Sequence, residues 1–418
     1  MRWGPPVVGA VTIPLVRHGP SRAQDYLPTV AFEALSPFIP GGAVPLTNRG
    51  DMLYTGEITV ATGPDSFGAT APTDPGGYGP VGGYAGARGS GEEAGSPPRA
   101  FTATVVFDTG SSDLWVVAAG GAGMLVAQGK RTEIQYGIGS VSGNIARTTV
   151  TIGDVVDAKQ QLLLADDTSG LPGSIDGVLG LAFPAMSKTT HTTVMDQLVQ
   201  QGGPGVFTFF LEQQSHGGGS AFKFGGPDPS WVPGDTGEWV PLTRRAWWSV
   251  GVEVAFRTGS SKYYEDTQGI LDTGTSFIGI PNGFYDEFMV QLVESVGDLC
   301  RMEPGNQFVM CSCDLRDTDQ LPLLHIRIGG TDHVVAPAHY VGAWGGSYCP
   351  IEIMRTAETF PWILGDPFLR TIVPTFDYAR SRVQLSPRSK GHLTTEQQRA
   401  AEADRAAGVL ERPGLVLG

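Results

Sequence analysis

The sequence lacks the run of about 20 apolar residues that a membrane-spanning helix requires. The apolar stretch nearest the start, within residues 1–16, is short and is interrupted by Pro5, Pro6 and Pro14. It has no clear small-residue cleavage site, so it makes a poor signal peptide. The chain also has no Asn-x-Ser/Thr glycosylation site. We therefore predict no membrane span, and these features leave the compartment open.

Basic charge is also scarce. The formal net charge is −14, whereas nucleic-acid binding requires a basic face, so a nucleic-acid partner is not expected. Hydrophobic residues make up 41% of the chain and charged residues 17%, which is typical of a globular protein rather than a disordered one. The 59 glycines and 31 prolines favour turns and strands over long helices.

Cysteine is rare, with only Cys300, Cys311, Cys313 and Cys349, all in the last third of the chain. They lack the C-x2-C pairs of a structural zinc site, so we expect no metal. Two disulfides in an oxidising compartment are the favoured interpretation, and four reduced thiols in a cytosolic protein are the alternative. Four cysteines allow three connectivities, which remain open at this point.

The amino-acid composition and the hydrophobic pattern change along the chain. Residues 1–43 form a mixed leader, and residues 388–418 form a hydrophilic tail. Between them, short alternating apolar runs separated by Gly, Pro and Asp predict an all-β protein. A Gly- and Pro-rich insert at 61–94 interrupts these runs and reads as a loop. Helices are expected at 193–201, at 282–296 and, as a solvated helix, at 395–407.

One internal repeat matters. Asp-Thr-Gly at 108–110 recurs at 272–274, each time after an apolar strand and before Ser-Ser or Thr-Ser. Each copy is followed later by an apolar-apolar-Gly segment, at 178–180 and at 363–365. A single Asp-Thr-Gly suits an ordinary turn. Two copies at domain-sized spacing instead predict two similar lobes that meet at a cleft.

Two carboxylates can activate water against an amide bond, which makes Asp108 and Asp272 the candidate catalytic residues. One carboxylate, ionised, accepts a proton from water, while the other, protonated, donates to the carbonyl oxygen. Two carboxylates about 3 Å apart cannot both ionise cheaply, so they share a proton. The neighbouring motif residues are expected to turn the backbone tightly, to hydrogen-bond across to the opposite loop and to hold the carboxylates: Thr109, Gly110, Ser111, Thr273, Gly274 and Thr275.

Longer segments around these motifs are distinctive. They are FDTGSSDLWV at 107–116, LDTGTSFIGIP at 271–281, IQYGIGSVSGNI at 134–145, SIDGVLGLAFP at 174–184 and WILGDPFLR at 362–370. Together they resemble the pepsin family of aspartic proteases, and the resemblance covers 44–60 and 95–387.

The resemblance implies an all-β, bilobal fold with two similar β lobes around a substrate cleft. The N-terminal lobe would span 44–240, including the insert at 61–94, and the C-terminal lobe 241–387. The implied protein is a monomeric aspartic endopeptidase without a cofactor, favoured at acidic pH and acting on polypeptides. It would occupy the secretory route or an acidic endolysosomal or vacuolar compartment.

The resemblance also implies that 134–145 form a hairpin flap over the cleft, with Tyr136, Gly137 and Ile138 facing substrate and Trp115 hydrogen-bonded to Tyr136. Ile138 stands where a small hydroxyl residue is common in the family, which should favour apolar side chains of the substrate. Read alone, Tyr136 is equally compatible with a hairpin aromatic that packs on a sheet.

We predict a disulfide between Cys313 and Cys349, which resembles the second-lobe disulfide of the family, and one between Cys300 and Cys311, which would pin a short hairpin. Cys311 and Cys313 could exchange these roles. Residues 11–17 resemble the start of a pepsin-type pro-segment, which predicts a zymogen that cleaves itself near 36–46.

The usual inhibitory lysine of such a pro-segment is absent, because the first lysine is Lys130, and Arg17 and Arg22 are the substitutes we expect. Two other classes remain as alternatives. A catalytically silent pepsin-like peptide-binding protein usually loses a motif Asp or Gly, and both copies are kept here. A small dimeric retroviral-type protease needs one motif per chain, which two copies argue against.

Overall fold

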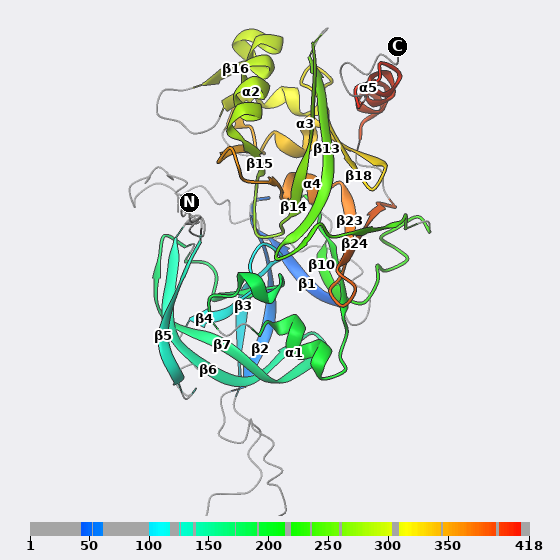
Figure 1. Cartoon of the computed structure of the whole chain (residues 1–418). Coiled ribbons are helices and arrows are strands. Elements are labelled where there is room, and N and C mark those ends of the chain that lie inside the picture. The colour runs from blue at the N-terminus through cyan, green and yellow to red at the C-terminus, as the bar shows by residue number, and fades with distance from the viewer. Residues whose placement is uncertain are drawn as a thin grey trace, which may run out of the picture.

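The computed structural model describes residues 43–51, 53–61, 100–117, 125, 127–136, 139–171, 173–189, 192–213, 219–234, 236–258, 261–302, 309–343, 346–389 and 393–410. The leader 1–43, except for Ala43, and the insert 61–94, except for Ala61, lie outside the described residues. Figure 1 shows two β-rich bodies, one above the other. The two-lobed, all-β fold expected from the sequence is therefore confirmed.

One long mixed sheet forms the lower body and continues into the junction with the upper body. Its strands are β1 (Ala43–Asn48), β2 (Tyr54–Ala61), β3 (Ala100–Asp108), β4 (Leu114–Val117), β5 (Ala127–Gln135), β6 (Ser140–Ile152), β7 (Val155–Ser169), β8 (Gly177–Gly180), β9 (Val206–Phe210), β10 (Ser220–Phe224), β11 (Trp239–Pro241), β23 (Ile372–Asp377) and β24 (Arg382–Pro387). Their order is β11-β24-β23-β9-β10-β1-β2-β3-β8-β4-β7-β6-β5. Burial alternates along most of β6 because successive side chains of a strand point to opposite faces of the sheet.

A second sheet forms the upper body, in the order β19-β18-β13-β14-β22-β15-β21, and β12 pairs with β13. Its strands are β12 (Arg244–Arg245), β13 (Trp248–Thr258), β14 (Ser261–Leu271), β15 (Ile278–Pro281), β18 (Leu324–Ile328), β19 (Thr331–Val335), β21 (Ile353–Thr356) and β22 (Trp362–Leu364). Apolar residues of both sheets join one continuous buried cluster, so the two bodies share a core.

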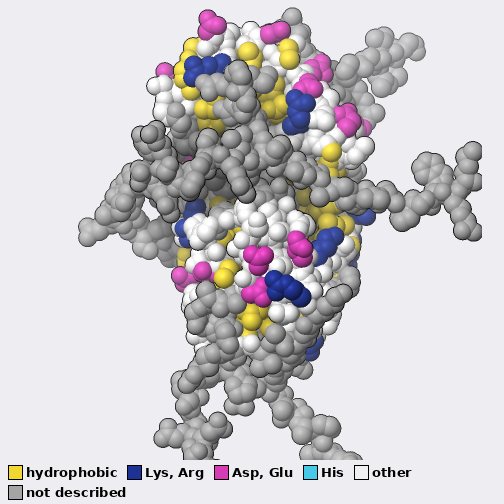
Figure 2. Space-filling view, turned by 90° about the vertical axis from the view of Figure 1, so that its left-hand side faces the viewer, with side chains coloured by type: hydrophobic (Ala, Val, Ile, Leu, Met, Phe, Trp, Pro, Cys, Tyr) yellow, Lys and Arg dark blue, Asp and Glu magenta, His cyan; other side chains and the backbone are white. Residues whose placement is uncertain are grey.

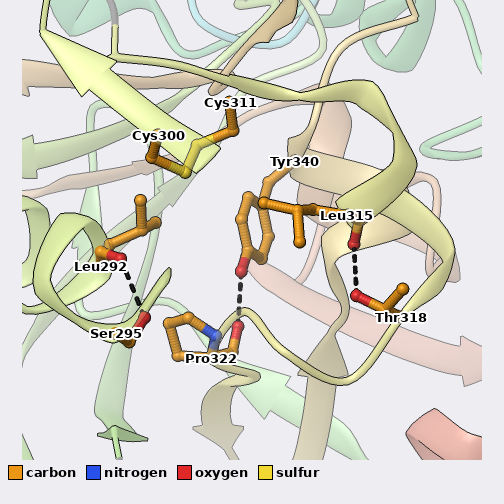
Figure 3. The surroundings of a disulfide bond; sticks show 8 residues. All are labelled: Leu292, Ser295, Cys300, Cys311, Leu315, Thr318, Pro322 and Tyr340. Carbon is orange, nitrogen blue, oxygen red and sulfur yellow. Dashed lines mark hydrogen bonds between the residues drawn. A yellow bond between two sulfur atoms is a disulfide. The ribbon is translucent and has the colours of Figure 1, made fainter. Parts of the chain in front are cut away.

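A small third sheet carries Cys300, Cys311 and Cys349, and Cys313 directly follows one of its strands. The sheet consists of β16 (Cys300–Met302), β17 (Val309–Ser312) and β20 (Tyr348–Pro350). Cys300 forms a disulfide with Cys311, and Cys313 forms one with Cys349, which is the pairing that the sequence favoured. Figure 3 shows the first disulfide above Tyr340, whose hydroxyl donates to the carbonyl of Pro322 at 2.6 Å.

The helices are few. They are α1 (Val194–Gln200), α2 (Asn282–Val296), α3 (Pro337–Tyr340), α4 (Asp366–Leu369) and α5 (Thr395–Ala406), with 3-10 turns at Pro184–Met186, Gly297–Leu299 and Cys313–Asp317. Thr193 caps α1 by a reciprocal pair of hydrogen bonds with Asp196. In the described part of the chain, none of these helices is long and apolar enough to cross a membrane. On the face shown in Figure 2, acidic and basic side chains are interspersed over the described surface.

The internal repeat of the sequence appears as a repeat of strand pairing. β3, which ends at Asp108, runs parallel to β8, and Asp108 lies opposite Gly180. β14, which ends one residue before Asp272, runs parallel to β22, and Leu271 lies opposite Leu364. The apolar residues of the two apolar-apolar-Gly segments thus lie on strands that support the strands leading to the aspartates.

Strands from both predicted lobes meet in the long sheet. β23 and β24, which the sequence places in the 241–387 unit, belong to this sheet, and β23 pairs with β9 of the 44–240 unit. Thr208 and Thr375 face each other there, with their hydroxyl oxygens 2.9 Å apart. The end of the chain therefore returns to close the junction between the two bodies.

The tail helix α5 differs from the expectation of a solvated helix. Gln397, Ala401 and Asp404 are buried on one side of it, and Figure 1 shows it against the outside of the upper body. Ala401 packs with Leu323 and Val334. Because the buried side consists of one alanine and polar groups, it leaves no apolar stripe for periodicity to detect.

A buried arginine ties the β1–β2 turn of the lower body to the upper body. The guanidinium of Arg370, which is 2% exposed, donates to Glu352 at 2.9 Å and to the carbonyl of His339 at 3.1 Å. It also donates to the carbonyl of Asp51, in the β1–β2 turn, at 3.1 Å. A buried charge is tolerated only where partners replace its water, and here the partners come from three separate segments.

We predict that Arg370→Leu lowers the free energy of unfolding by about 3–5 kcal/mol, because the Glu352 carboxyl group and the carbonyls of Asp51 and His339 would each lose a buried hydrogen bond. Urea denaturation measures this loss.

Arg380→Leu is the matched control. Arg380 also pairs with a carboxylate, Asp377, but its side chain is 67% exposed, so its loss should cost less than about 1 kcal/mol. Equal stability of the two variants would contradict the structural role of Arg370.

Candidate active site

The two Asp-Thr-Gly loops meet where β3 and β14 end. Phe107 and Leu271, the residues before the aspartates, are fully buried, so the strands fix the point at which each loop begins. Asp108 is 8% exposed, and Asp272 is partly exposed. Segments far apart in the sequence thereby place two carboxyl groups at one point between the bodies.

Reciprocal hydrogen bonds join the loops. The hydroxyl of Thr109 donates to the carbonyl of Leu271 at 2.9 Å, and that of Thr273 donates to the carbonyl of Phe107 at 2.6 Å. Each hydroxyl also accepts from the backbone N–H of the other threonine, at 2.9 and 3.0 Å. Both threonines are buried, so all four bonds are shielded from water.

Each carboxylate is held by its own loop. In both loops, the backbone N–H two positions after the Asp and the hydroxyl three positions after it donate to the carboxylate. These bonds are Gly110 N to Asp108 Oδ1 (2.7 Å), Ser111 Oγ to Asp108 Oδ2, Gly274 N to Asp272 Oδ1 (2.8 Å) and Thr275 Oγ1 to Asp272 Oδ2 (2.7 Å).

The motif glycines make room for the opposite carboxylate. A Cβ added to Gly110 would overlap the carboxylate of Asp272, and one added to Gly274 would overlap that of Asp108. Each carboxylate therefore lies directly against the glycine of the other loop. This close approach, rather than an unusual backbone angle, is what requires glycine at both positions.

The surroundings favour a shared proton. Burial raises the pKa of Asp108 to about 7, and the neighbouring charge of Asp272 adds to this effect. Burial also raises the pKa of Asp272 above its ordinary value. Aspartic proteases are the standard example of two carboxyl groups whose proximity splits their titration in this way. The pair therefore keeps one proton to higher pH than an isolated carboxyl group would.

Tyr136 lies close to this pair, at the end of β5. Its hydroxyl accepts from Nε1 of the buried Trp115 at 2.8 Å, and its N–H donates to the carbonyl of Gly139 at 2.7 Å, which closes the hairpin to β6. Burial and the charge of Asp108 raise the pKa of Tyr136, so the phenol stays neutral. The predicted tip residues Gly137 and Ile138 lie outside the described residues.

The sequence did not single out Asp366, which supports the second loop. It is 1% exposed and starts α4 directly after β22, and its N–H donates to the carbonyl of Thr275 at 2.9 Å. Burial raises the pKa of Asp366 well above its ordinary value. The sequence signal that could have identified Asp366 was the Gly-Asp-Pro at 365–367, directly after the apolar pair at 363–364.

Within the described ranges, no group of three or more His, Cys, Asp or Glu side chains is arranged to hold a metal ion. The two adjacent carboxyl groups of the site can transfer protons.

Two β bodies that each present an Asp-Thr-Gly loop to the other define the bilobal, pepsin-like class of protein. The chain belongs to the eukaryotic aspartyl protease family, whose sequence profile matches residues 93–388. Curated relatives include gastricsin of Callithrix jacchus, which is 31% identical over 316 residues, covering 69% of this chain and 78% of that protein. Pepsin F of Oryctolagus cuniculus is 32% identical over 319 residues (70% and 79%), and pregnancy-associated glycoprotein 4 of Ovis aries 32% over 315 residues (70% and 79%).

We predict that Thr109→Val destabilises the protein, because the N–H of Thr273 and the carbonyl of Leu271 would be buried without partners. Each such group costs about 1–3 kcal/mol. Denaturant unfolding measures the effect. Thr109→Ser keeps the hydroxyl and serves as the control, so a serine variant as unstable as the valine variant would show that hydrogen bonding is not the cause.

Proposed function

We propose that the protein is an aspartic endopeptidase in which Asp108 and Asp272 hydrolyse peptide bonds by acid–base activation of water. The observation that carries this proposal is the contact of each carboxylate with the glycine of the opposite loop, which brings the two carboxyl groups face to face. The raised pKa values of both aspartates support a pair that holds one proton.

In the proposed mechanism, a water molecule lies between the two carboxyl groups. The ionised carboxylate takes a proton from the water as its oxygen attacks the peptide carbonyl carbon, and the protonated carboxyl group donates to the carbonyl oxygen. The donors at Gly110, Ser111, Gly274 and Thr275 fix the carboxylate oxygens, so little reorganisation is needed during the reaction.

The hairpin that carries Tyr136 is proposed as the flap over the substrate, with Gly137 and Ile138 at its tip. The bond from Trp115 supports this role, since it holds the Tyr136 phenol beside the Asp108 loop. An isoleucine at 138 offers no hydroxyl to the substrate backbone, so we propose a preference for apolar side chains around the cut. The substrates would be polypeptides, and the working form would be a monomer.

Two features support an acidic or secretory location. The described cysteines are all paired in disulfides, which form in oxidising compartments. The proposed mechanism also needs one protonated carboxyl group, which acid supplies. The leader 1–43 is proposed as an inhibitory pro-segment that is removed when the pH falls.

The second candidate is a catalytically silent peptide-binding protein of the same fold. It is favoured by no observation at the site, since both aspartates and both motif glycines are present and correctly held. Cleavage of casein near pH 4, blocked by a statine peptide that mimics the transition state, distinguishes the enzyme from the binder.

We expect Asp108→Asn and Asp272→Asn each to lower kcat/KM for casein by at least about 100-fold, because neither carboxyl group can perform both proton transfers. The exposed Asp286, on α2, gives the matched control Asp286→Asn, which should be as active as the unchanged chain. Substantial activity in either site variant would refute the assignment.

The pH profile gives a further check on the same pair. The pKa of Asp108 is raised to about 7, so the shared proton is present below that pH and lost above it. We therefore expect kcat/KM to fall as the pH rises through about 7, by up to tenfold per pH unit. A profile that stays flat to pH 9 would contradict the shared proton.

Gly274→Ala is predicted to abolish activity while leaving the fold intact, because its methyl group would displace the carboxylate of Asp108. Activity and circular dichroism are measured together. Gly251→Ala, on β13, adds the same methyl group where no atom lies within 4 Å, so it should retain activity. Equal activity of the two variants would mean that the carboxylates do not lie where we place them.

A further inference from the structure

The chain continues beyond the part that matches the family, and this extension docks on the C-terminal lobe. The family match ends at residue 388, whereas α5 spans Thr395–Ala406. Ala401 on α5 packs with Leu323 and Val334, and Val409 and Leu410 pack against Ala255 on β13. Figure 1 shows α5 on the outer side of the lobe, near β18.

A buried histidine connects the extension to the lobe. His325, on β18, is 0% exposed, and its two ring nitrogens face two carboxylates. Nδ1 lies 3.1 Å from Oδ2 of Asp332, on β19, and Nε2 lies 3.2 Å from Oδ2 of Asp404, on α5. The imidazole therefore bridges the β18–β19 hairpin and the extension.

With Asp332 and Asp404 both ionised, the geometry favours two protons on this ring. A neutral imidazole carries one N–H, so one of its nitrogens would present a lone pair to a carboxylate oxygen, which is repulsive. Only the imidazolium donates to Asp332 and Asp404 at the same time. Two ionised carboxylates at these distances from the two ring nitrogens therefore favour the protonated state of His325.

The other charged groups around the ring do not titrate with it. Arg405, on α5, donates to Asp332 at 3.0 Å, and Arg327, on β18, pairs with Glu253 of β13 at 3.2 Å. Arginine keeps its charge across the physiological range. A cavity of about 110 Å³, lined by His325 and both arginines, adjoins the ring.

We propose that residues 394–410 form an acid-dependent latch, which is docked on the C-terminal lobe when His325 carries two protons and loosened when it carries one. This inference goes beyond the proposed peptidase activity and does not depend on it. In the neutral part of a secretory route the extension would be loose, and it would dock on arrival in an acidic compartment.

The direction in which pH changes the docking follows from the titration of His325 and Asp332. Burial opposes the charge on His325, but the hydrogen bonds that its ring donates to Asp332 and Asp404 outweigh this effect and raise the pKa of His325 above 6.5. Burial opposes the charge on Asp332 too, yet His325 and Arg405 hold the pKa of this carboxyl below 3.8. The hydrogen bonds of His325 therefore stabilise the docked extension at pH values above the pKa of Asp332 and below that of His325. This stabilisation is lost as the pH rises through the raised pKa of His325.

Hydrogen–deuterium exchange of the α5 amides in the full chain, expressed as protection factors between pH 5 and 8.5, tests the latch. In the unchanged chain the opening equilibrium should rise by up to tenfold per pH unit from about pH 6.5 to the pKa of docked His325, and then level off. Protection that is constant over this range would overturn the proposal.

Two variants sharpen the test. In Asp404→Asn the introduced amide can donate to a neutral His325, so the helix should stay protected at pH 8.5. Glu402→Gln removes the same charge from an exposed position of α5 and should keep the pH dependence of the unchanged chain. If Glu402→Gln also removes the pH dependence, the effect belongs to the overall charge of the helix, and the proposal fails.

The titration of the His325 ring, followed by NMR, gives a readout that does not rely on the variants folding. We expect a pKa above the ordinary 6.5 in the unchanged chain. A His325 pKa at or below 6.5 in the unchanged chain would overturn the latch.

Discussion

The reciprocal hydrogen bonds between Thr109 and Thr273 are the constraint on which the site depends. Two carboxyl groups repel each other as they ionise, so loops that carry them separate unless something holds the loops together. The threonine hydroxyls do this by bonding to the backbone that leads into the opposite loop. Because each threonine both donates and accepts, the hydrogen bonds fix the distance between the two loops. The motif glycines then leave space for the two carboxylates to approach each other.

Strand pairing in the rest of the fold supports the two loops in their positions. β3 and β14 each run beside a parallel partner strand, and the return of β23 to β9 closes the junction of the two bodies. Arg370 adds polar contacts between the bodies, since its guanidinium donates to Asp51, His339 and Glu352. The carboxyl groups can therefore remain close and partly buried although their charge opposes both conditions.

The sequence predicted the parts of the structure that leave a local pattern. The duplicated Asp-Thr-Gly, the alternating strands and the capped helix before Gln201 all depend on neighbouring residues. The membership of β23 in the long sheet could not be predicted, because strand pairing over long distances leaves no periodic signal. The docking of α5 was missed for a related reason, since Ala401 and Asp404 look like surface residues until His325 is placed beside them. The catalytic roles of the site residues stay predictions.

The cysteines lie in or beside one small sheet at the edge of the C-terminal lobe. Cys311 lies opposite both Cys300 and Cys349 across β16-β17-β20. Neither disulfide reaches β3 or β14, which lead to Asp108 and Asp272. The two disulfides, which reductants can break, are thus separate from the strands that position Asp108 and Asp272. A reducing environment acts first on this edge, while the strands that deliver the carboxyl groups are held by packing and hydrogen bonds that thiol exchange does not touch.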